Sequence, residues 1–176
     1  MNIEMHTKVI VIIPAYNEEE SLARVVSGVL AVVPAADVVV IDDGSHDRTP
    51  VVAERAGATV VSLPYNLGIG AAMQTGFMVA QAGDYHVAVQ VDGDGQHDPG
   101  EIVMLLDRLL SGEADVVVGS RFLENRGYVT PWLRMFGIRI LARYVSILAD
   151  QKFSDTTSGF RASNRLALES CAQNYP

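Results

Sequence analysis

Short apolar runs alternate with longer stretches of helical spacing along the first 120 residues. Continuous, β-branched runs are typical of buried parallel strands, and they cover Val9–Ile13, Val38–Ile41, Thr59–Leu63, His86–Val91 and Asp115–Val118. Between these runs, apolar residues recur with a helical period over 18–33, 47–56, 70–82 and 99–110. This alternation predicts an α/β fold with a mostly parallel sheet and helices on both of its faces.

Polar residues indicate where two of these helices begin. Asn17 precedes the first helical stretch and is a candidate N-cap, because its side chain can accept a hydrogen bond from a free N–H of the first turn. Asp98 and Pro99 fit the N-cap and the first position of the fourth helix, where a proline loses no hydrogen bond.

The pattern changes after Arg121. An apolar helical stretch covers 132–149 and contains Arg134, Arg139 and Arg143. Bulky apolar residues with a few arginines are typical of an amphipathic helix at a membrane interface. A helix that packs on the sheet and carries arginines at its rim would show the same pattern, so both interpretations stay open.

Length and composition are those of one globular domain, which we take to span 1–176. The chain has 176 residues, 49% of them hydrophobic, and one cysteine, Cys171, which excludes a disulfide framework and a multi-cysteine zinc site. The apolar run at 9–13 is too short for a signal peptide, and no run approaches the roughly 18 residues of a membrane span. These features favour a cytoplasmic protein.

The net charge of −8 is unevenly distributed. The first 120 residues hold 5 of the 13 Lys and Arg residues and 17 of the 21 Asp and Glu residues, so the remaining third is basic. An acidic body argues against nucleic acid as a partner. The basic C-terminal third predicts an anionic ligand or an anionic membrane surface on that side, unless it is an ordinary solvated face.

Two aspartates separated by one glycine follow the fourth predicted strand. Side chains alternate along a strand, so Asp92 and Asp94 can converge on one point just past its end. Two unpaired carboxylates this close repel each other, and a hard divalent cation removes that repulsion. Oxygen ligands suit Mg²⁺ or Mn²⁺, although a polar turn before a helix would also contain such aspartates.

Three predicted strands end in polar sequences that would share one edge of a parallel sheet. They are Pro14-Ala15-Tyr16-Asn17-Glu18-Glu19, Asp42-Asp43-Gly44-Ser45 and Asp92-Gly93-Asp94. Such sheets bind ligands at the carboxyl ends of their strands. A tyrosine ring can pack on a nucleotide base, and a carboxylate can accept from a base N–H or a ribose hydroxyl. Together the three ends therefore predict a nucleotide site, while each alone fits an ordinary turn.

A glycine-containing stretch, Asn66-Leu67-Gly68-Ile69-Gly70, opens the third predicted helix. Free N–H groups at a helix start can bind a phosphate. The stretch is not the dinucleotide-binding fingerprint, because Met73 stands where a third glycine is needed and because it follows the third strand rather than the first.

Six motifs, taken in order, resemble those of a known enzyme family. They are Val-Ile-Ile-Pro-Ala-Tyr-Asn-Glu-Glu, Ile-Asp-Asp-Gly-Ser, Asn-Leu-Gly-Ile-Gly, Asp-Gly-Asp-Gly-Gln-His-Asp-Pro, Gly-Ser-Arg-Phe and Thr-Ser-Gly-Phe-Arg. Their order over about residues 8–165 is similar to that of family 2 glycosyltransferases, which have the GT-A fold. Within that family the chain looks most like the polyprenyl-phosphate sugar transferases, such as the dolichyl-phosphate mannosyl- and glucosyltransferases.

The resemblance implies a role for each matching position. Asp92 and Asp94 would hold Mg²⁺ or Mn²⁺ on the donor diphosphate and, with Arg121, act as catalytic residues. Arg121, Ser158 and Arg161 would contact the phosphate of the acceptor. The nucleotide sugar would be bound by Pro14, Ala15, Tyr16, Glu18, Ile41, Asp43, Gly44, Asn66, Gly68, Asp92, Gly93, Asp94 and Gln96.

The implied function is a metal-dependent, inverting transfer of a hexose from a nucleotide-diphosphate sugar, of the GDP-mannose or UDP-glucose type, to a polyprenyl phosphate. A lipid phosphate is already ionised at neutral pH and needs no strong general base. A saccharide hydroxyl would need one, usually a carboxylate, and Asp155 is the nearest candidate in the distal half. Transfer to a saccharide is therefore the alternative within the family.

Residues 8–120 would form the nucleotide-sugar-binding half, and 121–176 an acceptor-side segment. Such relatives continue well past the Ser-Gly-Phe-Arg motif, whereas this sequence ends 15 residues after Arg161. We therefore expect a truncated C-terminus, and a non-catalytic nucleotide-sugar-binding domain is a further alternative. Many relatives also carry C-terminal membrane helices. Here we expect contact with the cytoplasmic face of a membrane to be peripheral or to go through a membrane-protein partner.

Overall fold

The computed structural model describes residues 7–119 and 158–175 of the chain. Its strands are β1 (Val9–Ala15), β2 (Asp37–Asp42), β3 (Thr59–Ser62), β4 (Val87–Gln90), β5 (Val116–Val118) and β6 (Arg161–Asn164). Its helices are α1 (Leu22–Val32), α2 (Thr49–Arg55), α3 (Ile69–Ala82), the 3-10 helix η1 (Pro99–Glu101), α4 (Ile102–Leu110) and α6 (Arg165–Gln173). The strands form one sheet in the order β3-β2-β1-β4-β6-β5.

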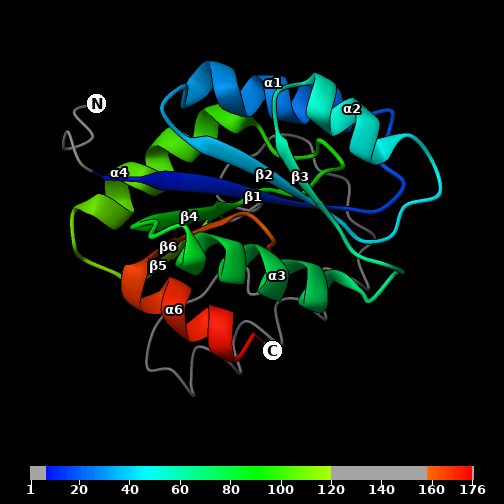
Figure 1. Cartoon of the computed structure of the whole chain (residues 1–176). Coiled ribbons are helices and arrows are strands. Elements are labelled where there is room, and N and C mark those ends of the chain that lie inside the picture. Colours follow the sequence, from blue (N-terminus) through cyan, green and yellow to red (C-terminus); the bar gives the residue numbers. More distant parts are fainter. Residues whose placement is uncertain (1–6, 120–157, 176) are drawn as a thin grey trace, which may run out of the picture.

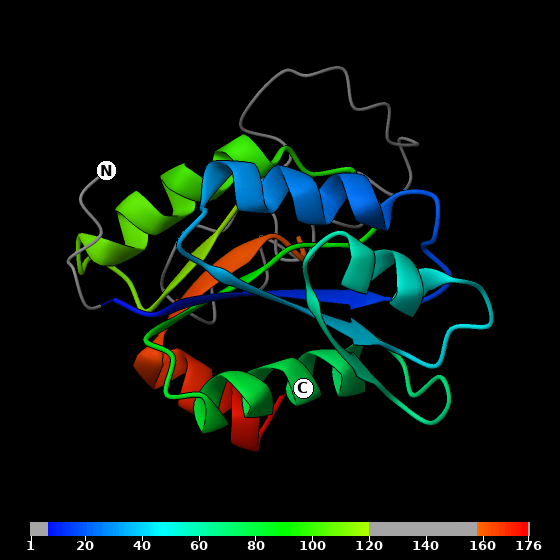
Figure 2. The same ribbon diagram turned by 45° about the horizontal axis from the view of Figure 1, so that its top comes forward.

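Helices cover both faces of this sheet. Helices α1, α2 and α4 lie on one face, and α3 and α6 lie on the other (Figures 1 and 2). The pairs β1–β2, β1–β4 and β2–β3 are parallel. The predicted α/β fold, with a mostly parallel sheet between two helical layers, is therefore confirmed.

The strand order reverses between β1 and β4. The chain runs outward from β1 to β2 and β3, and α3 then carries it back to β4 on the other side of β1. In an open parallel sheet, the loops on the two sides of such a reversal diverge and leave a crevice at the carboxyl ends of the strands. The topology therefore places a crevice next to the ends of β1 and β4.

Strand β6 is a part of the sheet that the sequence pattern did not predict. It is antiparallel to both of its neighbours and lies between β4 and β5. Ala162 is its one side chain in the layer beneath α1 and α4, and alternation puts the polar Arg161 and Ser163 on the opposite face. A four-residue segment of this composition has no strand signal of its own, so its partners determine its conformation.

Two apolar layers hold the helices to the sheet. In β1, Val9, Val11 and Ile13 belong to the layer beneath α1, α2 and α4, whereas Ile10 and Ile12 belong to the layer beneath α3 and α6. Each is at most 3% exposed, and burying such a side chain contributes about 1.5–3 kcal/mol. Because both faces are covered, the strand reads as a continuous apolar run rather than an alternating one.

Close packing of α3 on β1 depends on one glycine. A Cβ atom at Gly76 would lie 2.3 Å from Cγ2 of Ile12 and would clash with it, so only glycine fits here without a shift. The helix therefore presses directly on the central strand. This approach brings the first turn of α3 to the edge of the sheet where β1 ends.

The two predicted helix starts have different outcomes. The Asp98 side chain accepts from the Gly100 N–H at 2.9 Å, so its role as an N-cap is confirmed, with η1 as the first turn. The prediction for Asn17 is wrong, because α1 begins only at Leu22. Asn17 has a left-handed φ of 56° and accepts from the His46 N–H at 2.9 Å. Contacts with the loop after β2 thus hold this segment as a turn.

Several predictions concern residues that the structure does not describe. They are the arginine-containing helix at 132–149, Arg121 and Asp155. The division of the chain into 8–120 and 121–176 likewise stays a prediction. Over 7–119 and 158–175, no helix combines the length and the apolar character needed to cross a bilayer.

Candidate functional site

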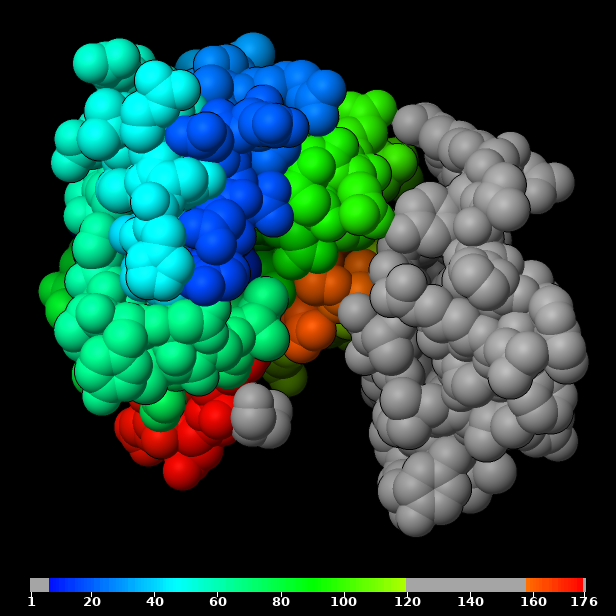
Figure 3. All heavy atoms as spheres, turned by 90° about the vertical axis from the view of Figure 1, so that its right-hand side faces the viewer, coloured from blue at the N-terminus to red at the C-terminus, as the bar shows by residue number. Residues whose placement is uncertain are grey.

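A cleft of about 390 Å³ opens at the carboxyl ends of β1, β2 and β4, beside the first turn of α3. Figure 3 looks onto this edge, where the segments after β1 (blue), β2 (cyan) and β4 (green) lie next to one another. The cleft is lined by Pro14, Ala15, Tyr16, Glu18, Asp43, Asn66, Gly68, Ile69, Ala72, Asp92, Gly93 and Asp94. The three polar strand ends therefore meet at one site, at the reversal of strand order.

Three of the residues expected to bind the nucleotide sugar do not line this cleft. Ile41 is fully buried in the layer beneath α3. Gly44 forms a tight turn behind the cleft, with a φ of +71° and room for no Cβ beside the Tyr65 backbone. Gln96 is exposed, and its backbone N–H donates to Oδ1 of Asp94 at 2.9 Å.

Two lining residues, Ile69 and Ala72, were missed by sequence reasoning. Both lie in the first turns of α3. Both could have been expected near the site, because the third predicted helix starts directly after the Asn66–Gly70 stretch at the ligand-binding edge of the sheet.

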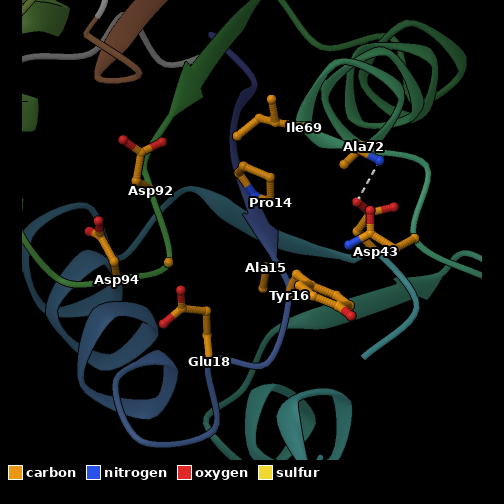
Figure 4. A pocket seen from close by; sticks show the side chains of 12 residues that line it. Pro14, Ala15, Tyr16, Glu18, Asp43, Ile69, Ala72, Asp92 and Asp94 are labelled. Atoms are coloured by element: carbon orange, nitrogen blue, oxygen red, sulfur yellow. Dashed lines mark hydrogen bonds between the residues drawn. The ribbon is translucent and has the colours of Figure 1, made fainter. Parts of the chain in front are cut away.

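Carboxylates line one side of the cleft. Asp92, Asp94 and Glu18 lie there together, whereas Tyr16 and Asp43 lie on the opposite side (Figure 4). The Asp92 side chain is 29% exposed, and Asp94 is exposed. Mutual repulsion of such groups favours a bound cation.

The turn that carries the two aspartates is anchored on both sides. Gly93 is buried against the end of β1, where a Cβ would lie 3.2 Å from the Pro14 carbonyl oxygen. The Ser21 hydroxyl lies 2.8 Å from the Gly93 carbonyl oxygen and 2.8 Å from Oε2 of Glu18. The loop before α1 therefore positions the acidic turn and the third carboxylate together.

Asp43 supports the opposite side of the cleft. Its buried carboxylate accepts from the N–H groups of Leu67 and Gly68, each at 2.8 Å, and its own N–H donates to the Ala15 carbonyl at 2.8 Å. The negative charge also suits the start of α3. Two of the N–H groups that were expected to be free for a phosphate at this helix start are thus bound by Asp43.

Tyr16 is held at the cleft by the loop after β2 and by the first residue of α2. The Asn17 N–H donates to the Ser45 hydroxyl at 2.9 Å, and the Glu18 N–H donates to the Thr49 hydroxyl at 2.8 Å. The Tyr16 side chain is 40% exposed, and its ring meets that of His46 edge-on at 6.4 Å. An exposed aromatic ring on a braced turn can pack on a planar ligand.

The segment from Ser158 to Arg161 approaches the acidic turn from β6. Ser158 is fully buried and accepts from the Phe160 N–H at 3.2 Å, and an Arg161 terminal nitrogen donates to the Ser158 carbonyl at 2.9 Å. Within the described part of the chain, Nε of Arg161 and Oε1 of Gln90 are buried without a hydrogen-bond partner. The segment thus reaches the site, but Ser158 presents no surface to it.

The charge of Arg161 also acts on the helix that covers it. Burial raises the pKa of Cys171 and of Tyr175, and in both cases the nearby Arg161 guanidinium works against the rise. The Asp92 charge raises the pKa of Tyr175 as well. The charges of Arg161 and Asp92 therefore both act on Tyr175.

Sequence comparison identifies the family. The model of glycosyl transferase family 2 matches residues 10–171. A polyprenol monophosphomannose synthase of Mycolicibacterium smegmatis is 35% identical over 170 residues, which cover 92% of this chain and 63% of that protein. An undecaprenyl-phosphate mannosyltransferase of Micrococcus luteus is 34% identical over 161 residues, which cover 88% of this chain and 65% of that protein.

Structural comparison agrees with the sequence. A glucosyl-3-phosphoglycerate synthase from Mycobacterium tuberculosis, solved in complex with Mn²⁺, UDP-glucose and phosphoglyceric acid, superposes with a TM-score of 0.66 at 26% identity, over 92% of this chain and 58% of that one. The chain spans half to two thirds of the length of the first curated relatives. The family match covers nearly all of the sequence, and the cleft is lined by the three predicted strand ends. The chain therefore belongs to glycosyl transferase family 2.

Proposed function

We propose that the chain contains the donor site of an enzyme that transfers a hexose from a nucleotide-diphosphate sugar to a polyprenyl phosphate. One observation carries the proposal: the Asp92 and Asp94 carboxylates face the same cleft as Tyr16 and Asp43, from the opposite side. A site with acidic groups on one side and an aromatic ring on the other suits a ligand with a diphosphate at one end and a base at the other. Two relatives are named for transfer to polyprenyl phosphates.

The base and ribose of the donor would bind on the Tyr16 side. The exposed ring can pack on the base, and Asp43 can accept from a base N–H through lone pairs that the two loop N–H groups leave unused. Because Asp43 also fixes the loop that contains Asn66 and Gly68, binding at this carboxylate would be coupled to the position of that loop.

Asp92 and Asp94 would hold Mg²⁺ or Mn²⁺. Two hard oxygen donors suit these ions. Glu18 lines the same side of the cleft, but across 7–119 and 158–175 no three His, Cys, Asp or Glu side chains are close enough together to hold a metal ion. The aspartates would thus supply part of a coordination shell that the donor diphosphate completes. When bound, the ion would neutralise the negative charge that develops on the leaving diphosphate. A related structure contains Mn²⁺ together with UDP-glucose.

The acceptor phosphate would attack the anomeric carbon from the face opposite the leaving group. A bond forms from a phosphate oxygen to that carbon, the bond from the carbon to the diphosphate oxygen breaks, and its electron pair leaves with the nucleoside diphosphate. The configuration at the carbon is inverted. No proton has to move, because the acceptor is already ionised, so no carboxylate is needed as a general base.

Arg121 and Arg161 remain the proposed contacts of the acceptor phosphate, whereas Ser158 is fully buried and would not touch it. The Arg161 guanidinium, whose charge acts on Tyr175 together with that of Asp92, would attract an anionic group. Ser158 would act through its buried hydroxyl, by holding the Phe160 N–H and thereby the segment that carries Arg161. A lipid acceptor also implies contact with a membrane surface.

A donor panel tests the proposal. The chain is incubated with Mn²⁺, labelled GDP-mannose or UDP-glucose, and either a short polyprenyl phosphate or phosphoglyceric acid, beside the variant Asp94→Asn. We expect wild type to transfer the label to the polyprenyl phosphate, and we expect Asp94→Asn to transfer none. Binding of the donor without transfer would favour the non-catalytic alternative. If no nucleotide sugar binds, or if Asp94→Asn transfers like wild type, the proposal is wrong.

A further inference from the structure

His97 lies against the first of the two aspartates. Its Nε2 is 3.3 Å from Oδ2 of Asp92, and its side chain is only 9% exposed. An ionised carboxylate has no hydrogen to donate, so Nε2 carries the hydrogen in this contact. Nothing in the proposed transfer uses His97, yet it is a nearly buried polar side chain in contact with a cleft carboxylate.

The His97 ring is held by a residue from the far end of the chain. It stacks on the Phe160 ring with centroids 4.9 Å apart and planes inclined by 13°. Phe160 is 1% exposed, and it fits because Gly119 has no Cβ, which would lie 2.4 Å from the ring. The Gly119 N–H also donates to the Phe160 carbonyl at 2.8 Å. The imidazole therefore cannot turn away from Asp92 without leaving a packed aromatic pair.

Gly159 also lies against the Asp92 carboxylate. A Cβ at that position would lie 2.3 Å from Oδ1 and 2.6 Å from Oδ2 of Asp92. The carboxylate thus has two close neighbours, the His97 imidazole and Gly159. These neighbours restrict its rotation, whereas Asp94, on the same turn, is exposed.

We infer that His97 is a positioning residue, which orients the Asp92 carboxylate toward the cleft through its Nε2–H donor. The inference rests on the proposed function in one respect, because it takes Asp92 as a ligand of the divalent cation. Hydrogen-bond partners of metal ligands set ligand orientation, and their loss typically lowers metal affinity or activity about 10–100-fold. The stack on Phe160 makes the position of this donor depend on the acceptor-side segment.

Two substitutions separate the donor from the stacked ring. His97→Phe keeps an aromatic ring for Phe160 but has no donor for Asp92. His97→Gln keeps an N–H donor but loses the ring. His86→Phe is the matched control, because His86 is an exposed histidine at the opposite end of the sheet that accepts from the Lys8 N–H. For each variant, Mn²⁺ affinity is measured by electron paramagnetic resonance with UDP or GDP present, and Tm is measured by calorimetry.

We expect His97→Phe to bind Mn²⁺ about 10–100-fold more weakly with a Tm near that of wild type, and His97→Gln to bind more tightly than His97→Phe. His86→Phe should bind like wild type. The inference is overturned if His97→Phe retains wild-type affinity, or if His97→Gln binds no better than His97→Phe. If wild type itself binds Mn²⁺ no better than Asp94→Asn, the metal site of the proposed function is wrong, and the inferred role of His97 is then wrong as well.

Discussion

Replacing Gly159 by alanine would push directly on the Asp92 carboxylate. The added Cβ would lie 2.3 Å from Oδ1, 2.6 Å from Oδ2 and 2.8 Å from Cγ. Ordinary van der Waals contact begins near 3.4 Å, so the two groups must separate by about 1 Å. The carboxylate is also in contact with His97, so a shift of this size would disturb that contact.

The cost of this substitution has two parts. Overpacking by one methyl group in a closed site typically costs about 1–3 kcal/mol of stability, and each kcal/mol lowers Tm by about 2–4 °C for a chain of this size. A displacement of about 1 Å in a group that orients the reacting parts can lower the rate by about 100-fold. We therefore expect Gly159→Ala to lose Mn²⁺ affinity and transfer activity well beyond what its lower Tm explains.

Gly76→Ala is a matched control for this prediction. Its Cβ would meet a core methyl group of Ile12, also at 2.3 Å, far from either aspartate. Both variants should have a lower Tm in calorimetry, but only Gly159→Ala should bind Mn²⁺ more weakly in a titration below both transition temperatures. The reasoning is refuted if the two variants lose affinity equally, or if Gly159→Ala binds Mn²⁺ like wild type.

Three further predictions concern other charged and polar groups. Asp43→Asn replaces one of the two oxygens that accept from the N–H groups of the loop before α3. We expect it to lower the free energy of unfolding in urea by about 1–3 kcal/mol and to weaken UDP or GDP binding in calorimetry. Unchanged values of both would contradict this role. Burial and a hydrogen bond to Asp37 raise the pKa of Tyr85 to about 12, so wild type should lose stability between about pH 10 and 12 in urea denaturation series. Tyr85→Phe should lose less over this range, keeping only the loss from other groups such as Tyr175; an equal loss in both proteins would contradict the reasoning. Burial alone would raise the pKa of Asp47, but hydrogen bonds from neighbouring groups lower it overall. This carboxyl thus adds stability above pH 3.8 that is lost as the pH falls, and the deficit of Asp47→Asn should shrink in acid; a constant deficit would refute the reasoning.

Hydrophobic periodicity predicted β1 to β5 and the helices between them because each has an apolar run or an apolar face in its own sequence. Strand β6 was missed because Arg161, Ser163 and Asn164 have no strand preference, and only Ala162 faces the apolar layer beneath α1 and α4. Its conformation comes from hydrogen bonds to β4 and β5 on both sides. The sequence of β6 itself contains no pattern that predicts these hydrogen bonds.

The start of α1 was misjudged for a related reason. Glu18, Glu19 and Glu20 are good helix formers, and their local preference continues the helix toward Asn17. Instead, Ser45 and His46 from the loop after β2 and Thr49 at the start of α2 hold the backbone before α1 as a turn. Contacts from another part of the chain outweigh a local preference of a few tenths of a kcal/mol per residue.

The site was predictable as far as it depends on strand ends. Parallel strands place their carboxyl ends at one edge, so Tyr16, Asp43 and Asp92 could be assigned to one cleft from the sequence alone. The hydrogen bonds of Asp43 to the loop before α3 and the contact of His97 with Asp92 could not be predicted. Both depend on distances in three dimensions that the sequence does not give. Ile41 was expected at the cleft, but strand alternation turns it into the layer beneath α3.

The contacts around Asp92 join the two predicted parts of the chain, 8–120 and 121–176. Asp92 lies in the first part, but Gly159 lies against its carboxylate, and Phe160 stacks on the histidine that contacts it. Phe160 is itself a buried member of the central apolar layer, so it cannot shift without disturbing the sheet. Under the proposed function, the residues that approach the acceptor also orient a ligand of the donor's cation. A change in the acceptor-side segment would then act on the donor site through Asp92, without touching the nucleotide.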